Sequence, residues 1–516
     1  MHWTPGQHWD SDGARIDRDG RRGISRRTFV QRAGLLGVSA AGLGSLSPSA
    51  VASHARRPKL GRGPLRVART NPRYLADQTG RLVYLAGAET WGNVQDGFIS
   101  TAFGYNWGTP FQERAFLDMM SANGLNYIRL WLYETPFVTN FGGEAGQPDD
   151  HPHPVPWLRT GPGTAFDGGP KFDLTKIDPA YVARFRERAQ AAGERGIYVS
   201  VMLFEGFSVL SPQAAQDLAG WAGHPFNATN NINGIDGDPG GTGQGIATHT
   251  LAIPAVTRLQ DLYVRTIVNA MNDLDNVLYE IANESPGTVE WQYHVIDTIK
   301  ALERCKLKRH PVFMSRVGRQ PGALSPQNND ILFQSRADVI APGNFAGLDL
   351  RSNPPEADGS KVIIAETDHM GFTALQDDPV GARAWAWKEF TRGNNPSLLD
   401  YDPDKSGFDE GVRALGDTRR MASRIDLVSM TPRSSLSSTG YCLADPSAEY
   451  LVYQPGSGAF TLNLRPGSYA LEWLDPSAGA TVARSHVAAT RHTRSVEFTP
   501  PFAGDAVLHL KSRRRH

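Results

Sequence analysis

The sequence predicts an α/β protein, a (β/α)8 TIM barrel followed by a small C-terminal all-β sandwich domain. From about residue 66 to residue 425, short apolar and β-branched runs alternate with helical patterns, which is typical of parallel strands buried on both faces. Two of these runs end abruptly in polar residues, at Asn283-Glu284 and at Glu366. After about Thr431 the helical period disappears, and short alternating runs separated by Gly, Pro and Asp indicate a sandwich over residues 431–516.

Length and composition agree with this organisation. A chain of 516 residues exceeds one ordinary core and suits a barrel of about 250 to 400 residues with a smaller module. Lys plus Arg and Asp plus Glu each number 53, so the formal net charge is zero, and no electrostatic reason to expect nucleic acid as a partner follows. With only Cys305 and Cys442 present, neither a disulfide framework nor a Cys-based zinc site is expected, although one bond between the domains stays open.

Residues 1–60 are expected to be an export signal and a flexible N-terminus. Ser25-Arg26-Arg27-Thr28-Phe29-Val30 resembles a twin-arginine (Tat) signal, a weakly apolar segment follows, and Ala50-Val51-Ala52 supplies a cleavage site. The apolar run is too short to span a bilayer, so no stable membrane anchor is expected. These features predict a secreted, periplasmic or cell-envelope protein. The alternative is a basic tail with a chance pair of arginines.

The first half of the barrel follows in order. Residues 73–85 read as a hairpin with a turn at Gly80, and its second arm continues into a first strand over 86–91. A helix over 111–121 precedes the second strand, 126–131. Asp178 as N-cap and Pro179 at the first helical position then begin a helix that leads to a third strand over 197–203.

The second half repeats the alternation of helix and strand. A helix over 255–274 precedes the fourth strand, which ends at Asn283-Glu284, and a helix over 289–302 precedes the fifth strand at 311–314. Residues 338–341 form a short sixth strand, and Glu366 ends the seventh. A Trp-rich helix over 381–391 leads to the eighth strand at 397–400. Eight strands close a barrel.

The carboxylates at the strand ends indicate a reaction class. The carboxyl ends of barrel strands meet at one mouth, so Glu284 and Glu366 are expected to face each other. One acid can protonate a leaving oxygen while the other, kept ionised, attacks or stabilises an oxocarbenium-like centre. This pair of roles is what glycoside hydrolysis requires. Either glutamate alone would more often be structural.

With these residues, the sequence resembles the glycoside hydrolases of clan A, which include the family 5 cellulases and mannanases. That clan has an Asn-Glu pair at the end of the fourth strand and a Glu at the end of the seventh, matched by Asn283-Glu284 and Glu366. An Arg near the end of the second strand is matched by Arg129. The resemblance implies a retaining mechanism without a cofactor, with Glu284 as acid/base and Glu366 as nucleophile. Asn283 would hold the sugar 2-hydroxyl, and Arg129 would keep Glu366 ionised.

Further residues are expected at the mouth. Trp91 and Trp131 lie at the ends of the first and second strands, and Asp368 would point to the same side of an extended strand as Glu366, so it is an alternative nucleophile. His369 would orient whichever carboxylate acts. The family's usual Trp after the eighth strand is absent, and Arg316 and Asn344 stand where aromatic and His residues are usual, which leaves the substrate open.

Two insertions, at about 140–173 and 208–249, follow the second and third strands and therefore lie on the catalytic face. The second carries Trp221, His224 and Asn227, residue types that stack on sugar faces or bond hydroxyl groups of a carbohydrate substrate. Equally, such side chains hold a long loop together.

Two rival interpretations remain beside the glycosidase. A carbohydrate-binding barrel without activity would keep the fold and lose the chemistry. A metal-dependent hydrolase would use the His-x-His spacing of His151 and His153, but prolines flank this pair inside an insertion instead of at a strand end. Asp236 and Asp238 suggest a calcium loop, yet the bidentate acid expected further along is missing. No metal is therefore expected. The C-terminal sandwich resembles glycosidase accessory modules, which either pack on the barrel or bind carbohydrate.

Overall fold

The computed structural model describes residues 8–9, 15–16 and 60–513, apart from 91, 98–112, 140–148, 211–219, 316–326, 344–348, 371–373, 400–405 and 493–494. The chain divides into two compact units, Met1–Arg56 and Arg57–His516. Within the first unit, β1 (His8–Trp9) and β2 (Arg15–Ile16) form an antiparallel pair. The predicted export signal lies outside the described residues, as do Trp91, Arg316 and Asn344.

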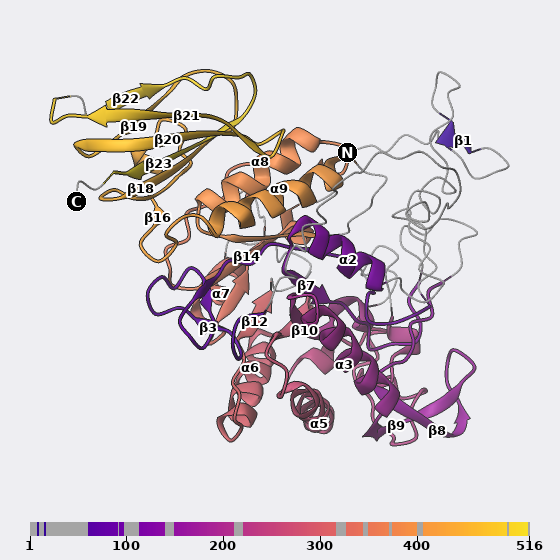
Figure 1. The fold of residues 1–516 in the computed structure, drawn as a ribbon. Coiled ribbons are helices and arrows are strands. Elements are labelled where there is room, and N and C mark those ends of the chain that lie inside the picture. Colours follow the sequence, from indigo (N-terminus) through magenta and orange to yellow (C-terminus); the bar gives the residue numbers. More distant parts are fainter. Residues whose placement is uncertain are drawn as a thin grey trace, which may run out of the picture. The chain divides into compact units, whose positions relative to one another are not determined.

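In the second unit, eight parallel strands close into a barrel (Figure 1). In order around the barrel these strands are β6 (Gly87–Glu89), β7 (Tyr127–Leu130), β10 (Tyr198–Glu205), β11 (Val277–Asn283), β12 (Val312–Ser315), β13 (Val339–Ala341), β14 (Val362–Glu366) and β15 (Asn395–Leu399). The predicted barrel is confirmed. Its register pairs Glu205 with Asn283 and Leu399 with Glu89, so the acids that end several strands lie at the same rim.

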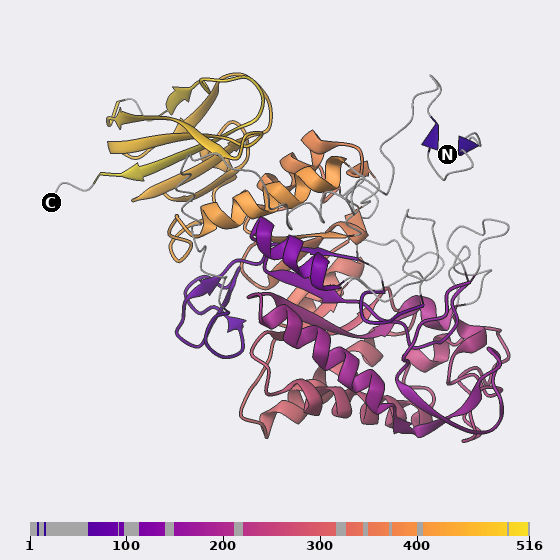
Figure 2. The ribbon, with the colours of Figure 1, turned by 45° about the vertical axis from the view of Figure 1, so that its right-hand side comes forward.

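Helices surround the barrel (Figures 1 and 2). They are α2 (Glu113–Asn123), α3 (Pro179–Gly193), α5 (Pro254–Met271), α6 (Val289–Arg304), α7 (Gln327–Gln334), α8 (Pro379–Thr391) and α9 (Ser406–Ala422). The predicted cap of α3 is present, because the Asp178 carboxylate accepts a hydrogen bond from Ala180 N at 2.8 Å. Two helices, α7 and α9, were not predicted. The eighth strand begins at Asn395, two residues before the predicted position.

The N-terminal hairpin belongs to a three-stranded antiparallel sheet of β3 (Arg66–Val67), β4 (Leu75–Ala76) and β5 (Leu82–Val83). Its apolar side chains form one buried cluster with residues from the beginnings of the barrel strands, among them Tyr127, Tyr198 and Leu278. The sheet therefore closes the end of the barrel opposite the carboxyl ends of the strands.

The insertions fold against each other. The first contains the antiparallel pair β8 (Trp157–Thr164) and β9 (Pro170–Ile177), and the second contains the 3-10 turns η2 (Trp221–Gly223) and η3 (Ile246–His249). The turn η1 (Gly206–Val209) directly follows β10. Aromatic residues of both insertions, including Trp157, Phe172, Trp221 and Phe226, share one apolar cluster.

The C-terminal region is a sandwich. Its larger sheet has six strands, β16 (Thr431–Pro432), β17 (Cys442–Asp445), β18 (Glu449–Gln454), β23 (Ala506–Ser512), β20 (Gly467–Asp475) and β21 (Ala480–Ala489), and the smaller sheet pairs β19 (Phe460–Asn463) with β22 (Ser495–Phe498). Side chains of both sheets share a core that includes Tyr450, Phe460, Trp473 and Phe498. The other face of the larger sheet packs on α8 and α9 (Figures 1 and 2), where Tyr453 stacks on Trp387.

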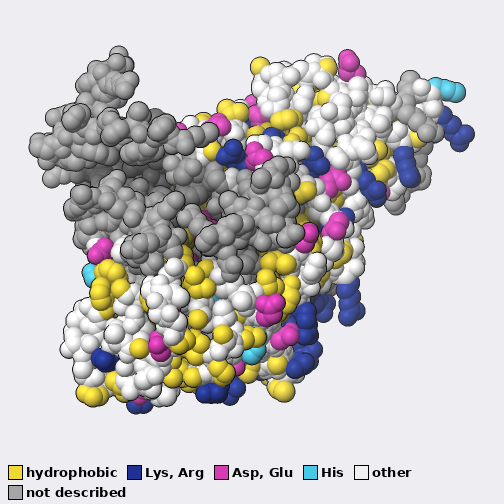
Figure 3. Space-filling model, turned by 180° about the vertical axis from the view of Figure 1, so that it is seen from behind, with side chains coloured by type: hydrophobic (Ala, Val, Ile, Leu, Met, Phe, Trp, Pro, Cys, Tyr) yellow, Lys and Arg dark blue, Asp and Glu magenta, His cyan; other side chains and the backbone are white. Residues whose placement is uncertain are grey.

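The surface carries both signs of charge. On the face shown in Figure 3, Lys and Arg side chains occur together with Asp and Glu, in keeping with the zero net charge. Cys305 is exposed and Cys442 buried, and both are free thiols. Among the described residues, no helix combines the length and the apolar character needed to cross a membrane.

Candidate active site

The centre of the site is Arg129, which points from β7 into the barrel and is fully buried. Its guanidinium group donates to both carboxylate oxygens of Glu280, with Nε 3.0 Å from Oε2 and Nη2 2.5 Å from Oε1. Its third nitrogen, Nη1, lies 3.1 Å from Oε2 of Glu366 at the end of β14. Such a planar fork suits several carboxylates at once. Arg129 and Glu366 are therefore in direct contact.

Two more acids reach the same guanidinium group. Glu89, at the end of β6, lies 3.7 Å from Arg129 Nε, and Asp368 lies 3.9 Å from Nη1. Burial raises the pKa of Glu89 well above its ordinary value, and the charges of Glu366, Glu280 and Asp368 raise it further, against the opposing effect of Arg129. One cation does not neutralise four carboxylates, and burial therefore favours the protonated form of Glu89.

Asn283 connects this cluster to a further acid. Arg129 Nη2 donates to Asn283 Oδ1 at 3.1 Å, and Asn283 Nδ2 donates to Glu205 Oε1 at 3.4 Å. Both Asn283 and Glu205 are buried. Because one end of the amide accepts from a cation and the other donates to a carboxyl group, its orientation is determined. The side chain of Asn283 therefore presents a defined edge at the end of β11.

Glu284 is the first residue after β11, and unlike Asn283 it is partly exposed. Its φ angle of 39° lies in the left-handed region, where a residue with a Cβ is strained. The backbone of Gly206 packs against it, since a Cβ on Gly206 would lie 2.1 Å from the carbonyl oxygen of Glu284. Burial raises the pKa of Glu205, and the charges of Glu284 and Asp368 raise it further. All three carboxyl groups therefore share one region of the rim.

Asp368 reaches the cluster by a different path from the predicted one. The strand ends at Glu366, and Thr367–Met370 forms a 3-10 helix, η4, instead of extended chain. The expected period of two therefore does not apply, yet both carboxylates lie within 4 Å of Arg129 Nη1, at 3.1 Å for Glu366 and 3.9 Å for Asp368. The side chain of His369 lies outside the described part of the structure.

The predicted aromatic residues fall into different environments. Trp131 is buried beneath the Arg129 guanidinium group, whose carbon lies 4.7 Å from the ring centre. Trp221 and His224 are also buried, with ring centres 5.3 Å apart, and Asn227 accepts hydrogen bonds from Thr229 within its own turn. These three contacts hold the insertion together. Their part in binding a substrate stays a prediction.

Three buried side chains, Ser285, His249 and Glu134, lie in a row beside the ends of the barrel strands. His249 Nδ1 lies 3.0 Å from Ser285 Oγ, and His249 Nε2 lies 3.7 Å from Glu134 Oε1. All three side chains are buried, and the His249 ring stacks on Trp291 with centres 4.3 Å apart. Glu134 also accepts from Glu205 N at 2.7 Å. The series therefore ties the second insertion to β10 and to the chain after β11.

Glu89 and Glu205 were missed by the sequence analysis, although each ends a buried strand in the manner of Glu366. The signal that could have identified Glu89 and Glu205 is the one that identified Glu366, a buried apolar run that ends in an acid. Among the described residues, no group of three or more His, Cys, Asp or Glu side chains is arranged to hold a metal ion. His153 Nδ1, from the H-x-H pair, lies 2.9 Å from the carbonyl oxygen of His151.

Comparison with known proteins agrees with this architecture. Residues 151–319 match a family model described as "Domain of unknown function (DUF6298)". No curated protein sequence matches the chain. A putative glycoside hydrolase from Bacteroides vulgatus ATCC 8482 has a similar structure, with a TM-score of 0.57 and 14% identity over 88% of this chain and 83% of that one.

Two further solved structures are similar. A glycoside hydrolase family 5 protein from the same organism gives a TM-score of 0.52 at 11% identity, covering 87% of this chain and 94% of its own. A protein named glycoside hydrolase gives 0.53 at 12% identity, covering 88% and 98%. At such identities the likeness establishes a shared fold. The matched family model extends from the first insertion to just beyond β12, and so includes Glu205, Asn283 and Glu284.

Proposed function

We propose that this protein is an exported glycoside hydrolase that cleaves an oligo- or polysaccharide by a retaining, two-carboxylate mechanism. The observation that carries the proposal is the position of Arg129, whose guanidinium group contacts both Glu366 and Asn283. It thereby links the end of β14 to the residue that precedes Glu284. The fold shared with glycoside hydrolases supports the same reading.

In the first step, Glu366 attacks the anomeric carbon while Glu284 gives its proton to the glycosidic oxygen. Arg129, 3.1 Å from Glu366, favours the ionised form of this nucleophile. The bond from the anomeric carbon to the leaving oxygen breaks as the bond to the Glu366 carboxylate forms. A glycosyl ester on Glu366 results.

In the second step, Glu284 acts as a base. It removes a proton from water, the water oxygen attacks the anomeric carbon, and the ester bond to Glu366 breaks. Two displacements retain the anomeric configuration. Asn283, held between Arg129 and Glu205, directs its amide toward the substrate hydroxyl next to the anomeric carbon. Glu284 is more exposed than Glu366, so it is the better placed of the two acids to contact the leaving group and the incoming water.

The test uses Glu284→Gln and Glu366→Gln in the full chain, with a panel of soluble β-linked glucans and mannans. We expect each variant to lose about 10²- to 10⁴-fold in turnover with an unchanged circular dichroism spectrum. Glu290→Gln, an exposed acid in the first turn of α6, is the matched control and keeps its activity. Near-native rates in both active-site variants would refute the mechanism, and a glycan that is bound but recovered intact would indicate a binding protein.

A 2-deoxy-2-fluoro glycoside with a good leaving group separates the two candidate nucleophiles. It should add one glycosyl group to the wild-type chain, and peptide mass spectrometry should place it on Glu366. Modification of Asp368 instead would assign the nucleophile to that residue. Export is tested separately, since replacing Arg26-Arg27 by Lys-Lys should keep the protein in the cytoplasm of a bacterium with a twin-arginine pathway.

A further inference from the structure

The outer wall of the barrel is incompletely covered behind β14. Between Ala341 at the end of β13 and Val362 at the start of β14, the described residues contain no helix, so none packs over the outward face of β14 there. Ile363 and Ala365, which alternate with the inward-facing Ile364, are instead met by the connecting segment and by α7 and α8. A cavity of about 330 Å³ remains.

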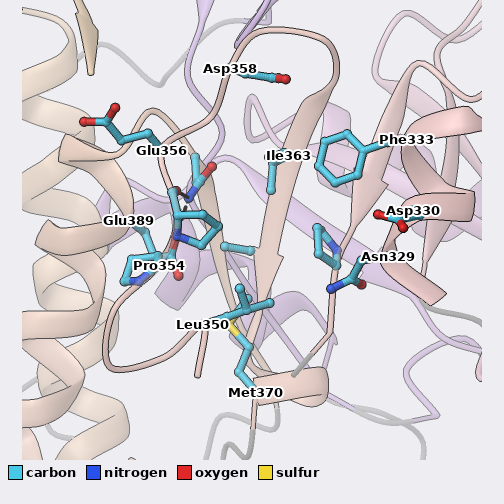
Figure 4. A pocket seen from close by; sticks show the side chains of 14 residues that line it. Asn329, Asp330, Phe333, Leu350, Pro354, Glu356, Asp358, Ile363, Met370 and Glu389 are labelled. Atoms are coloured by element: carbon cyan, nitrogen blue, oxygen red, sulfur yellow. Dashed lines mark hydrogen bonds between the residues drawn. The ribbon is translucent and has the colours of Figure 1, made fainter. Parts of the chain in front are cut away.

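The cavity is lined mainly by apolar side chains. Figure 4 shows Phe333 and Asn329 on one side of β14, Glu389 and Pro354 on the other, and Met370 at one end. Small-molecule sites usually enclose about 300 to 1,000 Å³, and a dry apolar cavity of about 150 Å³ already admits benzene. The space therefore accommodates a molecule with one ring and a short polar group.

Three buried polar side chains line this apolar space, Asn329 from α7, Glu389 from α8 and Asn394 just before β15. The Asn329 amide is paired with the backbone of Gly343 at 3.0 and 3.1 Å. Asn394 Nδ2 donates to Glu389 Oε2 at 2.8 Å and to the carbonyl oxygen of Pro355 at 3.4 Å. These bonds determine the orientation of the amide. Asn394 Oδ1, also buried, accepts no hydrogen bond from the described residues. A buried acceptor without a donor is unfavourable, so a ligand N–H would stabilise it.

The charged side chains that line the cavity are all acidic, and cations lie behind them, since Arg392 is 3.9 Å from Glu356 and the charges of Arg392 and Lys388 act on Glu389. Asp330, Glu356 and Asp358 line it together with Glu389, and the lining residues include no Lys, Arg or His. Burial raises the pKa of Glu389 to about 8, although the hydrogen bond from Asn394 and the charges of Arg392 and Lys388 oppose the shift. At neutral pH this carboxyl group is therefore mostly protonated, and a bound cation would favour its ionisation.

We propose that this cavity binds a small apolar cation, an aryl or alkyl compound with an amidinium or ammonium group. Its apolar body would lie against Phe333, Ile363 and Ala365, and its N–H groups would donate to Glu389 and to Asn394 Oδ1. The site is outside the barrel, separate from the Arg129 cluster, and does not depend on the proposed glycosidase activity.

Benzamidine is the probe and neutral benzamide, nearly identical in shape, its matched control. Binding to the full chain is measured by calorimetry at pH 7 and pH 9, a range in which benzamidine keeps its charge. The ionised fraction of Glu389 rises from about one tenth to about nine tenths, so benzamidine affinity should rise about tenfold, whereas benzamide affinity should not change. Equal affinities for the two compounds, or no detectable benzamidine binding at pH 9, would overturn the proposal.

Variants locate the binding. Glu389→Gln should abolish the pH dependence and bind benzamidine no better than benzamide, and Glu290→Gln should bind as the wild type does. Because Glu389 is buried, Phe333→Lys provides a second test on a side chain that is 37% exposed. The added cation at the cavity mouth should weaken benzamidine binding at least fivefold with the melting temperature retained. Unchanged binding in Phe333→Lys would place benzamidine elsewhere and refute the assignment.

Discussion

Arg129 is a buried cation on which several buried acids depend. It donates two hydrogen bonds to Glu280 and contacts Glu366, and each of these side chains is fully buried. Removing one member of such a group leaves the others charged and without compensation. Arg129→Met should therefore lower the free energy of unfolding by about 3 to 5 kcal/mol.

The matched control is Arg184→Met, which removes an arginine 3.0 Å from Asp96 at a position where both side chains are partly exposed. Exposed ion pairs contribute about 0 to 1 kcal/mol. Urea unfolding of the two variants measures the difference. Equal losses would mean that burial does not raise the energetic importance of the Arg129 cluster.

Glu205 makes stability depend on pH. Burial raises its pKa, with further increases from Glu284 and Asp368, so the folded state keeps a proton that the unfolded state loses above about pH 4.3. Folded protein then binds more protons than unfolded protein, and the free energy of unfolding falls as pH rises through this range. Glu205→Gln cannot titrate. Between pH 5 and 8 the unfolding free energy of this variant should therefore fall less steeply than that of the wild type. The difference between the two slopes corresponds to at most one bound proton.

Urea unfolding at four pH values measures this slope, and the exposed Glu290→Gln serves as control because its carboxyl group is not buried. A slope that is the same in the wild type and in Glu205→Gln would show that Glu205 ionises in the folded protein. The comparison does not depend on any substrate.

That Arg129 would act on Glu366 is implied by the resemblance of the sequence to clan A, which has an Arg near the end of the second strand and a Glu at the end of the seventh. Asp368 could not be placed in the same way, since the period of two holds only while the chain is extended and the strand ends at Glu366. Trp221 illustrates a different difficulty. The sequence alone does not distinguish an aromatic residue that binds a ligand from one that packs inside an insertion, as Trp221 does against His224.

At the scale of elements, the junction between β10 and η1 determines where Glu284 lies. Gly206 begins η1, and a Cβ there would meet the Glu284 carbonyl oxygen at 2.1 Å and its carbonyl carbon at 2.6 Å. Backbone atoms cannot turn aside as a flexible side chain does. Gly206→Ala should therefore displace Glu284 and, under the proposed function, lower turnover at least tenfold with secondary structure retained.

Gly240→Ala is the control for this substitution, because its new Cβ would meet only Thr242 Cγ2, at an ordinary 3.6 Å. Turnover and circular dichroism of both variants are compared on the same substrate. Full activity in Gly206→Ala would show that the position of Glu284 is not set by this contact.

Elements with strong local signals could be predicted, and those that depend on tertiary packing could not. Helix α3 has an Asp cap, a Pro at its start and an apolar period. Helix α9 contains Gly407, Gly411 and Gly416, which oppose helix formation locally, yet it packs closely on α8. Strand β8 includes Gly161-Pro162-Gly163 and has no alternating apolar pattern. In both cases the surrounding structure overrides the local preference.

At the scale of the whole second unit, the barrel and the C-terminal sandwich share a continuous core. One buried cluster extends from the barrel strands through Trp387 and Phe390 on α8 to Tyr441 and Tyr453 of the sandwich region. Polar contacts cross the same boundary, since Arg383 on α8 donates to both carboxylate oxygens of Asp505 at 2.8 and 3.0 Å. Two regions joined in this way are expected to unfold together.

This expectation gives a test at the same boundary. Arg383→Leu leaves the buried Asp505 with the Tyr453 hydroxyl, 3.0 Å away, as its one remaining donor among the described residues, and should cost about 3 to 5 kcal/mol of unfolding free energy. Arg424→Leu removes an ion pair with Glu472, where the arginine is 40% exposed, and should cost no more than about 1 kcal/mol. Because the core is continuous, Arg383→Leu should lower one shared transition, seen together in calorimetry and in near-ultraviolet circular dichroism. Two separated transitions in the wild type would contradict a single cooperative unit. Two separated transitions in Arg383→Leu alone would show that Arg383 couples the sandwich to the barrel.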